Sequence, residues 1–273
     1  MPPLSTSAVV TALRSAGCVF AEDEAELILA TARTADEAAA MLDRRVAGLP
    51  LELVLGWAEF RGLRITVEPG VFIPRRRTEF LVQQALAAAP GASVVVDLCC
   101  GSGAVGAALA ASLDGAALHA ADIEPAAVRC ARRNVAPFGG HVHEGDLFAA
   151  LPDTLLGRID LLAANVPYVP TGEVSLLPAE ARDHEPLAAL DGGVDGLDVL
   201  RRVAAEAPRW LAPGGHLLIE TSARQAPLAV RTFTHSGLST RLAVSEEWDA
   251  HVVIGTRPGA LLVEHLPAPE GSA

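Results

Sequence analysis

Lysine is absent from this chain of 273 residues, and all 21 basic residues are arginine. The absence excludes mechanisms that need a lysine amine: a Walker A phosphate loop, a pyridoxal Schiff base, and a biotinyl or lipoyl carrier. Aromatic residues make up only 4% of the sequence, so the core must be built mainly from alanine, valine and leucine. Uncharged stretches that could span a membrane are missing, and the N-terminus lacks the basic start and long apolar run of a signal peptide.

Cysteine is also scarce, and the four cysteines, at positions 18, 99, 100 and 130, lack the spacing of zinc ligands. We therefore expect no metal site and a reduced, cytoplasmic protein. The 33 acidic residues outnumber the basic ones and give a net charge of −12. This balance argues against a broad nucleic-acid-binding surface, because such surfaces must neutralise phosphates.

Apolar spacing divides the chain into three parts. Residues 1–50 place apolar side chains at helical spacing in short segments, which predicts a small helical domain. It is either a stabilising cap or a domain for substrate recognition. Residues 51–78 contain an alternating stretch and a Pro-Gly turn, which predict a linker hairpin. Residues 79–273 form the main domain, apart from a polar tail at 267–273 that we expect to be disordered.

The main domain alternates apolar strands with helices, which predicts an α/β fold with a mostly parallel sheet covered by helices on both faces. The expected strands are residues 93–98, 116–121, 141–143, 159–164, 216–220, 242–244 and 251–254, the last two forming an antiparallel pair. The expected helices are residues 105–113, 124–134 and 199–211, and a turn is expected at 213–215.

A glycine loop follows the first strand of this domain. Residues 101–106 (GSGAVG) fit the pattern G-x-G-x-x-G between a predicted strand and a predicted helix. Glycines there let the backbone approach a ligand at a helix N-terminus, so Gly101, Ser102 and Gly103 are expected to contact a cofactor. Folds that bind NAD and folds that bind S-adenosylmethionine share this pattern, so the loop alone leaves both open.

Acidic residues follow three successive strands. Asp97 ends the first, where a carboxylate suits a ligand that carries an ammonium group and would repel a pyrophosphate. Asp122 ends the second, where ribose hydroxyls need a bidentate acceptor, and Asp146 follows the third, within reach of an adenine amino group. Ligands of open α/β sheets bind at these strand ends. We extend the expected cofactor site to the neighbours Ile123 and Leu147 and to Asn165.

The tetrapeptide Asn165-Val166-Pro167-Tyr168 follows the fourth strand and holds one of two asparagines and the only tyrosine. It suits a planar amino group as methyl acceptor. Such a nitrogen is a poor nucleophile because its lone pair is delocalised, and a site helps by accepting both N–H bonds and fixing the direction of attack. We expect the Asn165 oxygen and the Val166 carbonyl to be the two acceptors, with Tyr168 packed on the flat group. All four residues, Pro167 included, are expected catalytic residues.

Several stretches resemble the protein-glutamine methyltransferases of the HemK/PrmC family. Residues 56–63 (GWAEFRGL) are similar to the family's linker, and residues 72–79 (FIPRRRTE) follow its IPRP-x-TE pattern. The glycine loop and the tetrapeptide come next. Residues 183–197 contain DHEP, ALDGG and DGL, a further family signature that general methyltransferases do not share. Residues 251–255 (HVVIG) resemble the family's closing strand.

The resemblance implies a Rossmann-like class I methyltransferase with a mostly parallel seven-stranded sheet and S-adenosylmethionine as methyl donor. It implies that the acceptor is a glutamine side-chain amide in a protein, which in the best-known members is the Gly-Gly-Gln motif of peptide-chain release factors. Asn165 and the Val166 carbonyl would hold this amide. The cofactor roles that carry over are the methionine pocket for Asp97, Gly101 and Gly103, the ribose for Asp122 and the adenine for Asp146.

The chain departs from the family pattern at a few positions. Val166 replaces the first proline of Asn-Pro-Pro-Tyr, which keeps the carbonyl but adds an N–H that needs a partner. Arg76 and Arg77 stand where the family has proline and an acid, and Cys99-Cys100 precedes the glycine loop. These changes predict a divergent member, whose protein substrate is a release factor or another protein.

Three other functions stay open at this level. An adenine-amino methyltransferase of DNA or RNA uses a similar tetrapeptide, and the arginine clusters at 75–77 and 129–133 could contact phosphates, although the net charge and the signature at 183–197 favour a protein acceptor. An NAD-dependent oxidoreductase conflicts with Asp97 and with the tetrapeptide. A non-enzymatic module would bind the cofactor without turnover if Val166 spoils the acceptor geometry.

Overall fold

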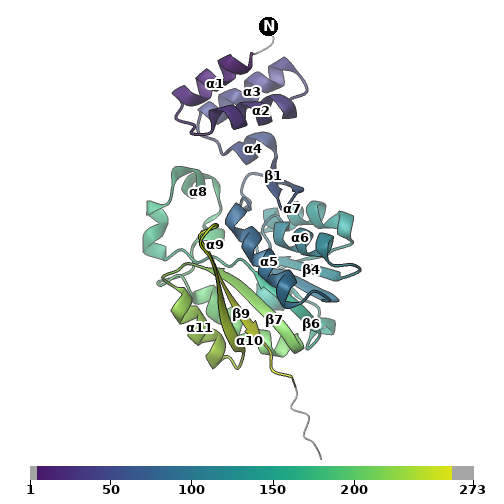
Figure 1. Cartoon of the computed structure of the whole chain (residues 1–273). Helices are drawn as coiled ribbons and strands as arrows, with labels where there is room; N and C mark the ends of the chain where they lie inside the picture. Colours follow the sequence, from purple (N-terminus) through teal and green to yellow (C-terminus); the bar gives the residue numbers. More distant parts are fainter. Residues whose placement is uncertain (1–4, 260–273) are drawn as a thin grey trace, which may run out of the picture.

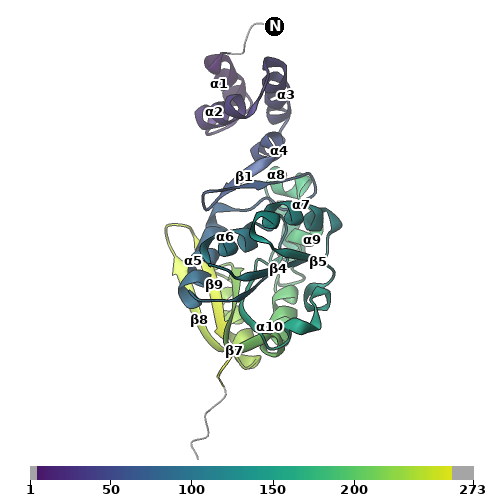
Figure 2. The same cartoon turned by 90° about the vertical axis from the view of Figure 1, so that its right-hand side faces the viewer.

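A computed structural model describes residues 5–259 of the chain, and the predicted polar tail at 267–273 lies outside this range. Figure 1 shows a small helical unit set above an α/β domain, and Figure 2 shows the sheet of that domain from the side. No helix within residues 5–259 is long and apolar enough to cross a membrane.

The first four helices form a unit with its own apolar core. They are α1 (Thr6–Ser15), α2 (Ala21–Thr31), α3 (Ala35–Val46) and α4 (Leu51–Leu55). Side chains from all four, such as Leu13, Ile28, Met41 and Val54, share one buried cluster. Because α4 lies beyond residue 50 and packs on this cluster, we propose that the helical domain extends to residue 55.

The linker holds a two-stranded antiparallel hairpin, β1 (Trp57–Phe60) and β2 (Leu63–Thr66). The sequence indicated only the second strand, through the alternating stretch at 64–67, and the Pro-Gly pair at 69–70 follows the hairpin instead of forming its turn. Its turn is the pair Arg61-Gly62, and both residues have positive φ, 49° and 75°. Two-residue hairpin loops favour this left-handed conformation because its twist matches that of the strands.

The main sheet has seven strands in the order β5-β4-β3-β6-β7-β9-β8. Neighbours from β5 to β7 are parallel, whereas β9 runs antiparallel to both β7 and β8, which confirms the predicted fold class and the final antiparallel pair. The strands are β3 (Val94–Leu98), β4 (Ala117–Asp122), β5 (His141–Glu144), β6 (Ile159–Ala164), β7 (Leu211–Thr221), β8 (Ser239–Ser245) and β9 (Ala250–Thr256).

The order of the strands reverses between β3 and β6. From β3 the chain adds β4 and β5 on one side, and then returns to add β6 on the other side. Loops that leave β3 and β6 therefore diverge, and a crevice opens at the carboxyl ends of these two strands. The glycine loop follows β3 and the tetrapeptide follows β6, so both face this crevice.

Helices cover both faces of the sheet (Figures 1 and 2). Alternate side chains of one strand enter opposite cores: Val95 packs with the helices α5 and α6, and Val96 packs with α10 and α11. The helices of this domain are α5 (Glu79–Ala88), α6 (Ala104–Ser112), α7 (Pro125–Val135), α8 (Ala179–His184), α9 (Leu187–Leu190), α10 (Asp198–Trp210) and α11 (Ala226–His235). Short 3-10 turns are η1 (Arg76–Thr78), η2 (Ala136–Phe138), η3 (Leu147–Ala150), η4 (Asp153–Leu155) and η5 (Thr171–Leu176).

One local prediction was wrong. The turn expected at 213–215 is part of β7, which begins at Leu211 instead of His216. The register explains the difference, because Ile159 pairs with Leu211 and the next pair is Leu161 with His216, so the Pro-Gly-Gly stretch is an irregularity inside the strand. Gly215 is needed there, since a Cβ would lie 2.5 Å from the Ile159 carbonyl oxygen.

Three histidines cluster on the β4–β5 edge of the sheet. His119 Nδ1 lies 3.0 Å from His143 Nε2, and the ring of His141 lies 5.4 Å from that of His119. Within residues 5–259 no group of His, Cys, Asp or Glu is arranged to hold a metal ion. Burial and the neighbouring histidines lower the pKa of His119, and burial, His141 and Arg132 lower the pKa of His143.

This cluster predicts a specific acid sensitivity. A lowered pKa means that the folded state favours neutral rings, so the stabilisation is present above the unfolded pKa of 6.5 and is lost as the pH falls through the lowered values. We expect the melting temperature to fall less between pH 7.5 and pH 5.5 for His143→Gln than for the wild type. Calorimetric melting of both proteins at the two pH values measures this, and an equal fall would show that the cluster does not titrate with folding.

Candidate active site

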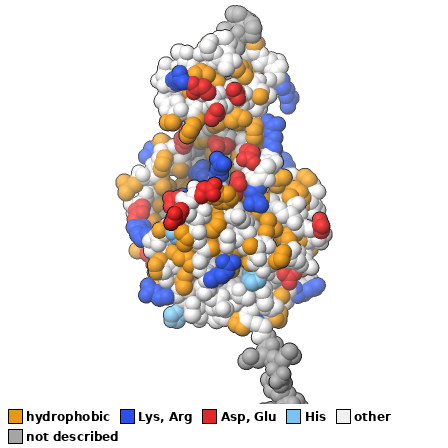
Figure 3. All heavy atoms as spheres, in the orientation of Figure 1, with side chains coloured by type: hydrophobic (Ala, Val, Ile, Leu, Met, Phe, Trp, Pro, Cys, Tyr) orange, Lys and Arg blue, Asp and Glu red, His pale blue; other side chains and the backbone are white. Residues whose placement is uncertain are grey.

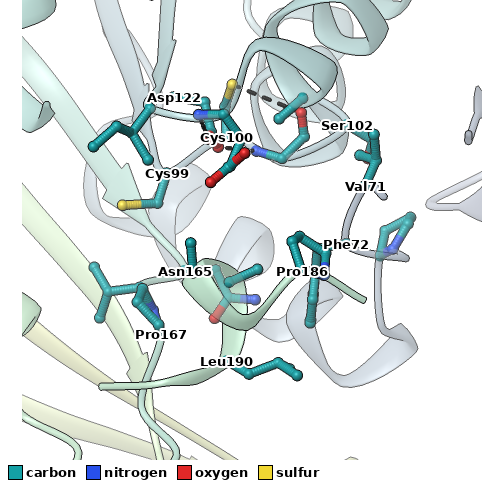
Figure 4. Close-up of a pocket in the computed structure, with 18 of the residues that line it drawn as sticks. Val71, Phe72, Cys99, Cys100, Ser102, Asp122, Asn165, Pro167, Pro186 and Leu190 are labelled. Carbon is teal, nitrogen blue, oxygen red and sulfur yellow. Dashed lines mark hydrogen bonds between the residues drawn. The ribbon is translucent and has the colours of Figure 1, made fainter. Parts of the chain in front are cut away.

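A cavity of about 650 Å³ lies at the carboxyl ends of β3, β4 and β6. Figure 4 shows the glycine-loop side, with Asp122, Cys100 and Ser102, across the cavity from Asn165 and Pro167. Phe72 and Pro186 lie at one end of the open space in the same view. The predicted residues that line the cavity are Asp97, Gly101, Ser102, Asp122, Ile123, Asp146, Leu147, Asn165, Val166, Pro167 and Tyr168. The predicted cofactor site and the predicted acceptor site, which are far apart in the sequence, thus line one cavity.

The Asp97 side chain supports the glycine loop through a hydrogen bond to its last residue. This side chain is 1% exposed, and its Oδ2 accepts a hydrogen bond of 2.8 Å from the Gly106 N–H in the first turn of α6. Burial raises the pKa of Asp97 to about 7, and the Gly106 N–H opposes the rise. Gly103 is not a lining residue. A Cβ on it would lie 3.1 Å from Ala131 Cβ, so the structure places Gly103 where α6 packs closely on α7.

Asp122 joins the end of β4 to the glycine loop. Its Oδ2 accepts from the Gly101 N–H at 2.8 Å, and its Oδ1 accepts from the Glu124 N–H at 2.9 Å. Burial raises the pKa of Asp122, while these N–H donors oppose the rise. Each carboxylate oxygen has a second lone pair, so the group can still accept hydrogen bonds from a diol in the cavity.

Asp146 also lines the cavity, and it has a partner that the sequence did not indicate. Its Oδ2 is 2.5 Å from an amino nitrogen of Arg202, which projects from α10 and also lines the cavity. Leu147 follows with φ at 49°, an uncommon value for a residue with a Cβ. Ile123 is 57% exposed beside Asp122, so an apolar surface adjoins the acids.

The tetrapeptide after β6 combines a buried anchor with an accessible amide. Val166 is 1% exposed, and its side chain joins the apolar core of the main domain. Asn165 Nδ2 is 3.4 Å from Thr78 Oγ1, on the loop of residues 70–78 that bounds the cavity. The Tyr168 hydroxyl contacts Arg77, and burial raises the pKa of Tyr168 to about 12.

The glycines of the signature at 183–197 pack on the backbone of this tetrapeptide. A Cβ on Gly192 would lie 2.6 Å from the Pro167 carbonyl oxygen, and one on Gly196 would lie 2.2 Å from that of Tyr168. Gln225 Nε2 donates to the Tyr168 carbonyl at 2.8 Å. These close contacts give a physical reason for glycine at both positions and hold the tetrapeptide in place.

A buried ion pair connects the segment that holds α8 and α9, which we call the cover of the cavity, to the loop of residues 70–78. Glu185 joins α8 to α9, and its Oε1 accepts from Arg75 at 2.6 Å and from the Ile73 N–H at 3.2 Å. Burial raises the pKa of Glu185, and Arg75 opposes the rise. At the other end of α8, Glu180 pairs with Arg45 of α3 at 2.9 Å, which connects the cover to the helical unit. Figure 3 shows charged side chains of both signs side by side in the hollow below that unit.

Comparison with known proteins places these features in context. A family model described as methyltransferase small domain matches residues 62–179. A release factor glutamine methyltransferase of Geobacter sulfurreducens is 39% identical over 221 residues, which cover 80% of this chain and 77% of the relative. A 4-amino-L-phenylalanine/4-methylamino-L-phenylalanine methyltransferase of Streptomyces pristinaespiralis is 36% identical over 201 residues, covering 71% of this chain and 68% of the relative.

The fold has a counterpart among solved structures. A methyltransferase from Pyrococcus furiosus superposes with a TM-score of 0.56 at 16% identity, over 72% of this chain and 90% of that chain. At this identity the likeness concerns the fold, and it confirms the α/β methyltransferase architecture.

Proposed function

The chain belongs to the family of release factor glutamine methyltransferases, and from this premise we propose that it methylates a glutamine side-chain amide in a peptide-chain release factor, with S-adenosylmethionine as donor. The observation that carries the proposal is the position of Asn165 across the cavity from Asp122. Donor and acceptor groups bound at these two places would face each other. A release factor substrate would place the reaction in the cytoplasm.

The residues of the cavity fit S-adenosylmethionine. Asp97 provides a buried carboxylate for the ammonium group, and Asp122 has free lone pairs for the ribose hydroxyls. Asp146 would accept from the adenine amino group, while Arg202 holds its other oxygen. When bound, the cofactor supplies a methyl group on a positively charged sulfur. The carboxylates that line the cavity suit this charge.

Asn165 and Val166 would prepare the acceptor. The side-chain oxygen of the first and the carbonyl of the second accept the two N–H bonds of the glutamine amide and hold its nitrogen toward the donor. Positioning supplies the acceleration, since no strong base is needed before transfer: the N-methylated cation is acidic and loses its proton afterwards. Tyr168 would pack on the flat amide.

Removing the ribose partner gives a direct test of the cofactor site. We expect Asp122→Ala to weaken S-adenosylmethionine binding by ~1–3 kcal/mol, because hydrogen bonds to a charged group contribute about this much. Calorimetric titration with S-adenosylhomocysteine measures the change. Asp114→Ala, at an exposed position in the turn before the same strand, is the matched control and should bind normally. Unchanged affinity in Asp122→Ala would move the ribose elsewhere.

The structure weakens one argument for the nucleic-acid alternative, because three of the six arginines in its two clusters are paired with acids. Arg75 pairs with Glu185, Arg77 with Glu220, and Arg133 with Glu68, so these arginines are engaged by acids of the same chain. Their charge is then not free for a phosphate backbone.

A small aromatic amine is a second candidate acceptor, because the relative from S. pristinaespiralis is named for 4-amino-L-phenylalanine. The test is transfer of labelled methyl from S-adenosylmethionine to three substrates side by side. These are a release factor, the same factor with the glutamine of Gly-Gly-Gln changed to glutamate, and free 4-amino-L-phenylalanine. We expect label only on the unmodified release factor. Label on the amino acid alone would replace the protein acceptor with the amine.

A further inference from the structure

A partly exposed arginine lines the cavity beside the tetrapeptide. Arg77 is among the lining residues, and its side chain is 45% exposed. One of its amino groups donates to the Tyr168 hydroxyl, and its guanidinium carbon lies 5.8 Å from the centre of the Tyr168 ring. The next residue, Thr78, has its hydroxyl oxygen 3.4 Å from Asn165 Nδ2. Arg77 therefore adjoins two of the residues that would hold the glutamine amide.

A buried carboxylate holds this arginine from the side of the protein. The Glu220 side chain, near the end of β7, is 3% exposed, and its Oε1 lies 3.3 Å from Arg77 Nε. The same oxygen is 3.5 Å from the Tyr168 hydroxyl. The guanidinium is thus fixed at two points before any acceptor arrives, so a ligand that uses it loses less side-chain entropy on binding.

These contacts leave part of the guanidinium available. A guanidinium carries five N–H donors and no acceptor. Nε of Arg77 faces Glu220 and Nη2 faces Tyr168, whereas Nη1 has no partner within residues 5–259. Because the side chain is nearly half exposed and lines the cavity, its remaining donors are open to an oxygen atom of a ligand.

Charge decides which kind of oxygen suits these donors. Within residues 5–259, each of the three arginines that line the cavity is already paired with an acid, so none offers an uncompensated positive charge to a carboxylate. A neutral carbonyl oxygen needs only the N–H donor and brings no charge of its own. The pairs are Arg75–Glu185, Arg77–Glu220 and Arg202–Asp146.

The length of a glutamine side chain indicates which carbonyl is in reach. The single bonds between its amide carbon and its backbone carbonyl carbon span about 5 Å when extended. An amide packed on the Tyr168 ring therefore brings the adjoining peptide groups close to the guanidinium, 5.8 Å from that ring. We propose that Arg77 donates from Nη1 to a backbone carbonyl oxygen of the acceptor beside the reacting glutamine, and so selects a glutamine that is part of a polypeptide. This deepens the proposed function and rests on it.

The kinetic test removes Arg77 together with its charge partner, because a buried Glu220 without a partner destabilises the fold. In Arg77→Met with Glu220→Gln, we expect KM for a release factor to rise between ~10-fold and ~100-fold, the usual cost of losing a hydrogen bond from a charged group. The contact is remote from the reacting nitrogen and is the same in the ground state and the transition state. We therefore expect kcat and KM for S-adenosylmethionine to be unchanged.

Two further variants separate the contact from the stability of the site. Arg76→Met is the matched control, since Arg76 is exposed and, within the described chain, is not among the residues that line the cavity. It should keep the KM of the wild type. Glu220→Gln alone should raise KM less than the double change does. A fall in kcat of the double variant would show that the change only disturbs the tetrapeptide, and this would overturn the proposal.

Binding of short peptides tests the class of ligand without turnover. The probes are acetyl-Gly-Gly-Gln-Ala-amide and acetyl-Gly-Gly-Gln-Asp-amide, titrated calorimetrically into enzyme saturated with S-adenosylhomocysteine. We expect the wild type to bind both equally and the double variant to bind both at least ~10-fold more weakly. Tighter binding of the aspartate peptide that depends on Arg77 would make a carboxylate the ligand and overturn the carbonyl contact.

The outcomes separate this inference from the proposed function. A release factor that the wild type and the double variant methylate with the same KM would overturn the role of Arg77 and leave the reaction in place. A peptide that binds in an Arg77-dependent way but is never methylated would contradict the reaction and support the role of Arg77.

Discussion

Replacing Asn165 with alanine is expected to lower kcat for methyl transfer about 10²–10³-fold. The magnitude follows from sites where a fixed hydrogen-bonding partner of the reacting group is removed, which costs about 3–4 kcal/mol in the transition state. The variant keeps the Val166 carbonyl, so one N–H of the acceptor remains bound, but the direction of the nitrogen is no longer fixed. Single-turnover assays with a release factor measure the chemical step directly.

Cofactor binding is the control for this variant. Asn165 lies across the cavity from Asp122, so the affinity for S-adenosylhomocysteine should change little in Asn165→Ala. A variant that binds normally and turns over slowly supports the acceptor role. One that keeps the full rate would remove Asn165 from the mechanism, and one that only loses cofactor affinity would assign it to the cofactor site alone.

Arg75→Ala is expected to lower the free energy of unfolding by about 3 kcal/mol. The Glu185 side chain is 1% exposed, and removing its partner leaves a buried charge without compensation, which costs ~3–5 kcal/mol for a fully buried pair. The Arg75 side chain is 34% exposed, so the effect falls at the lower end. Because Glu185 joins α8 to α9, the cover of the cavity should loosen in the same variant. Denaturant unfolding measures the first effect.

Arg76→Ala is the matched control, since this neighbouring arginine is exposed. Its free energy of unfolding should stay within ~0.5 kcal/mol of the wild type, as for ordinary surface substitutions. Equal stability of Arg75→Ala and Arg76→Ala would show that the Arg75–Glu185 pair does not hold the cover.

The sequence predicted the parts of the site that local pattern determines. Parallel strands bring their carboxyl ends to one edge, so Asp97, Asp122 and Asp146 could be placed together before any coordinates. The tetrapeptide at 165–168 stood out because asparagine and tyrosine are so rare in this chain. The sheet itself followed from regular alternation of strands and helices.

The parts that were missed depend on contacts between distant positions. Arg202 reaches Asp146 from a helix 56 residues further along the chain, and nothing in its local pattern separates it from Arg201. Glu220 ends the strand expected at 216–220, and only contacts between distant positions bring it to Arg77 and Tyr168. The sequence did not indicate β1, because a strand of four residues that ends in a left-handed turn gives too short an alternation of apolar and polar side chains.

The most direct test of the account is tandem mass spectrometry of a release factor after incubation with the enzyme and S-adenosylmethionine. The account predicts one added methyl group, located on the side-chain nitrogen of the glutamine in Gly-Gly-Gln, and its disappearance with Asn165→Ala. A methyl group on any other residue, or an unmodified release factor with an enzyme that binds its cofactor normally, would contradict it.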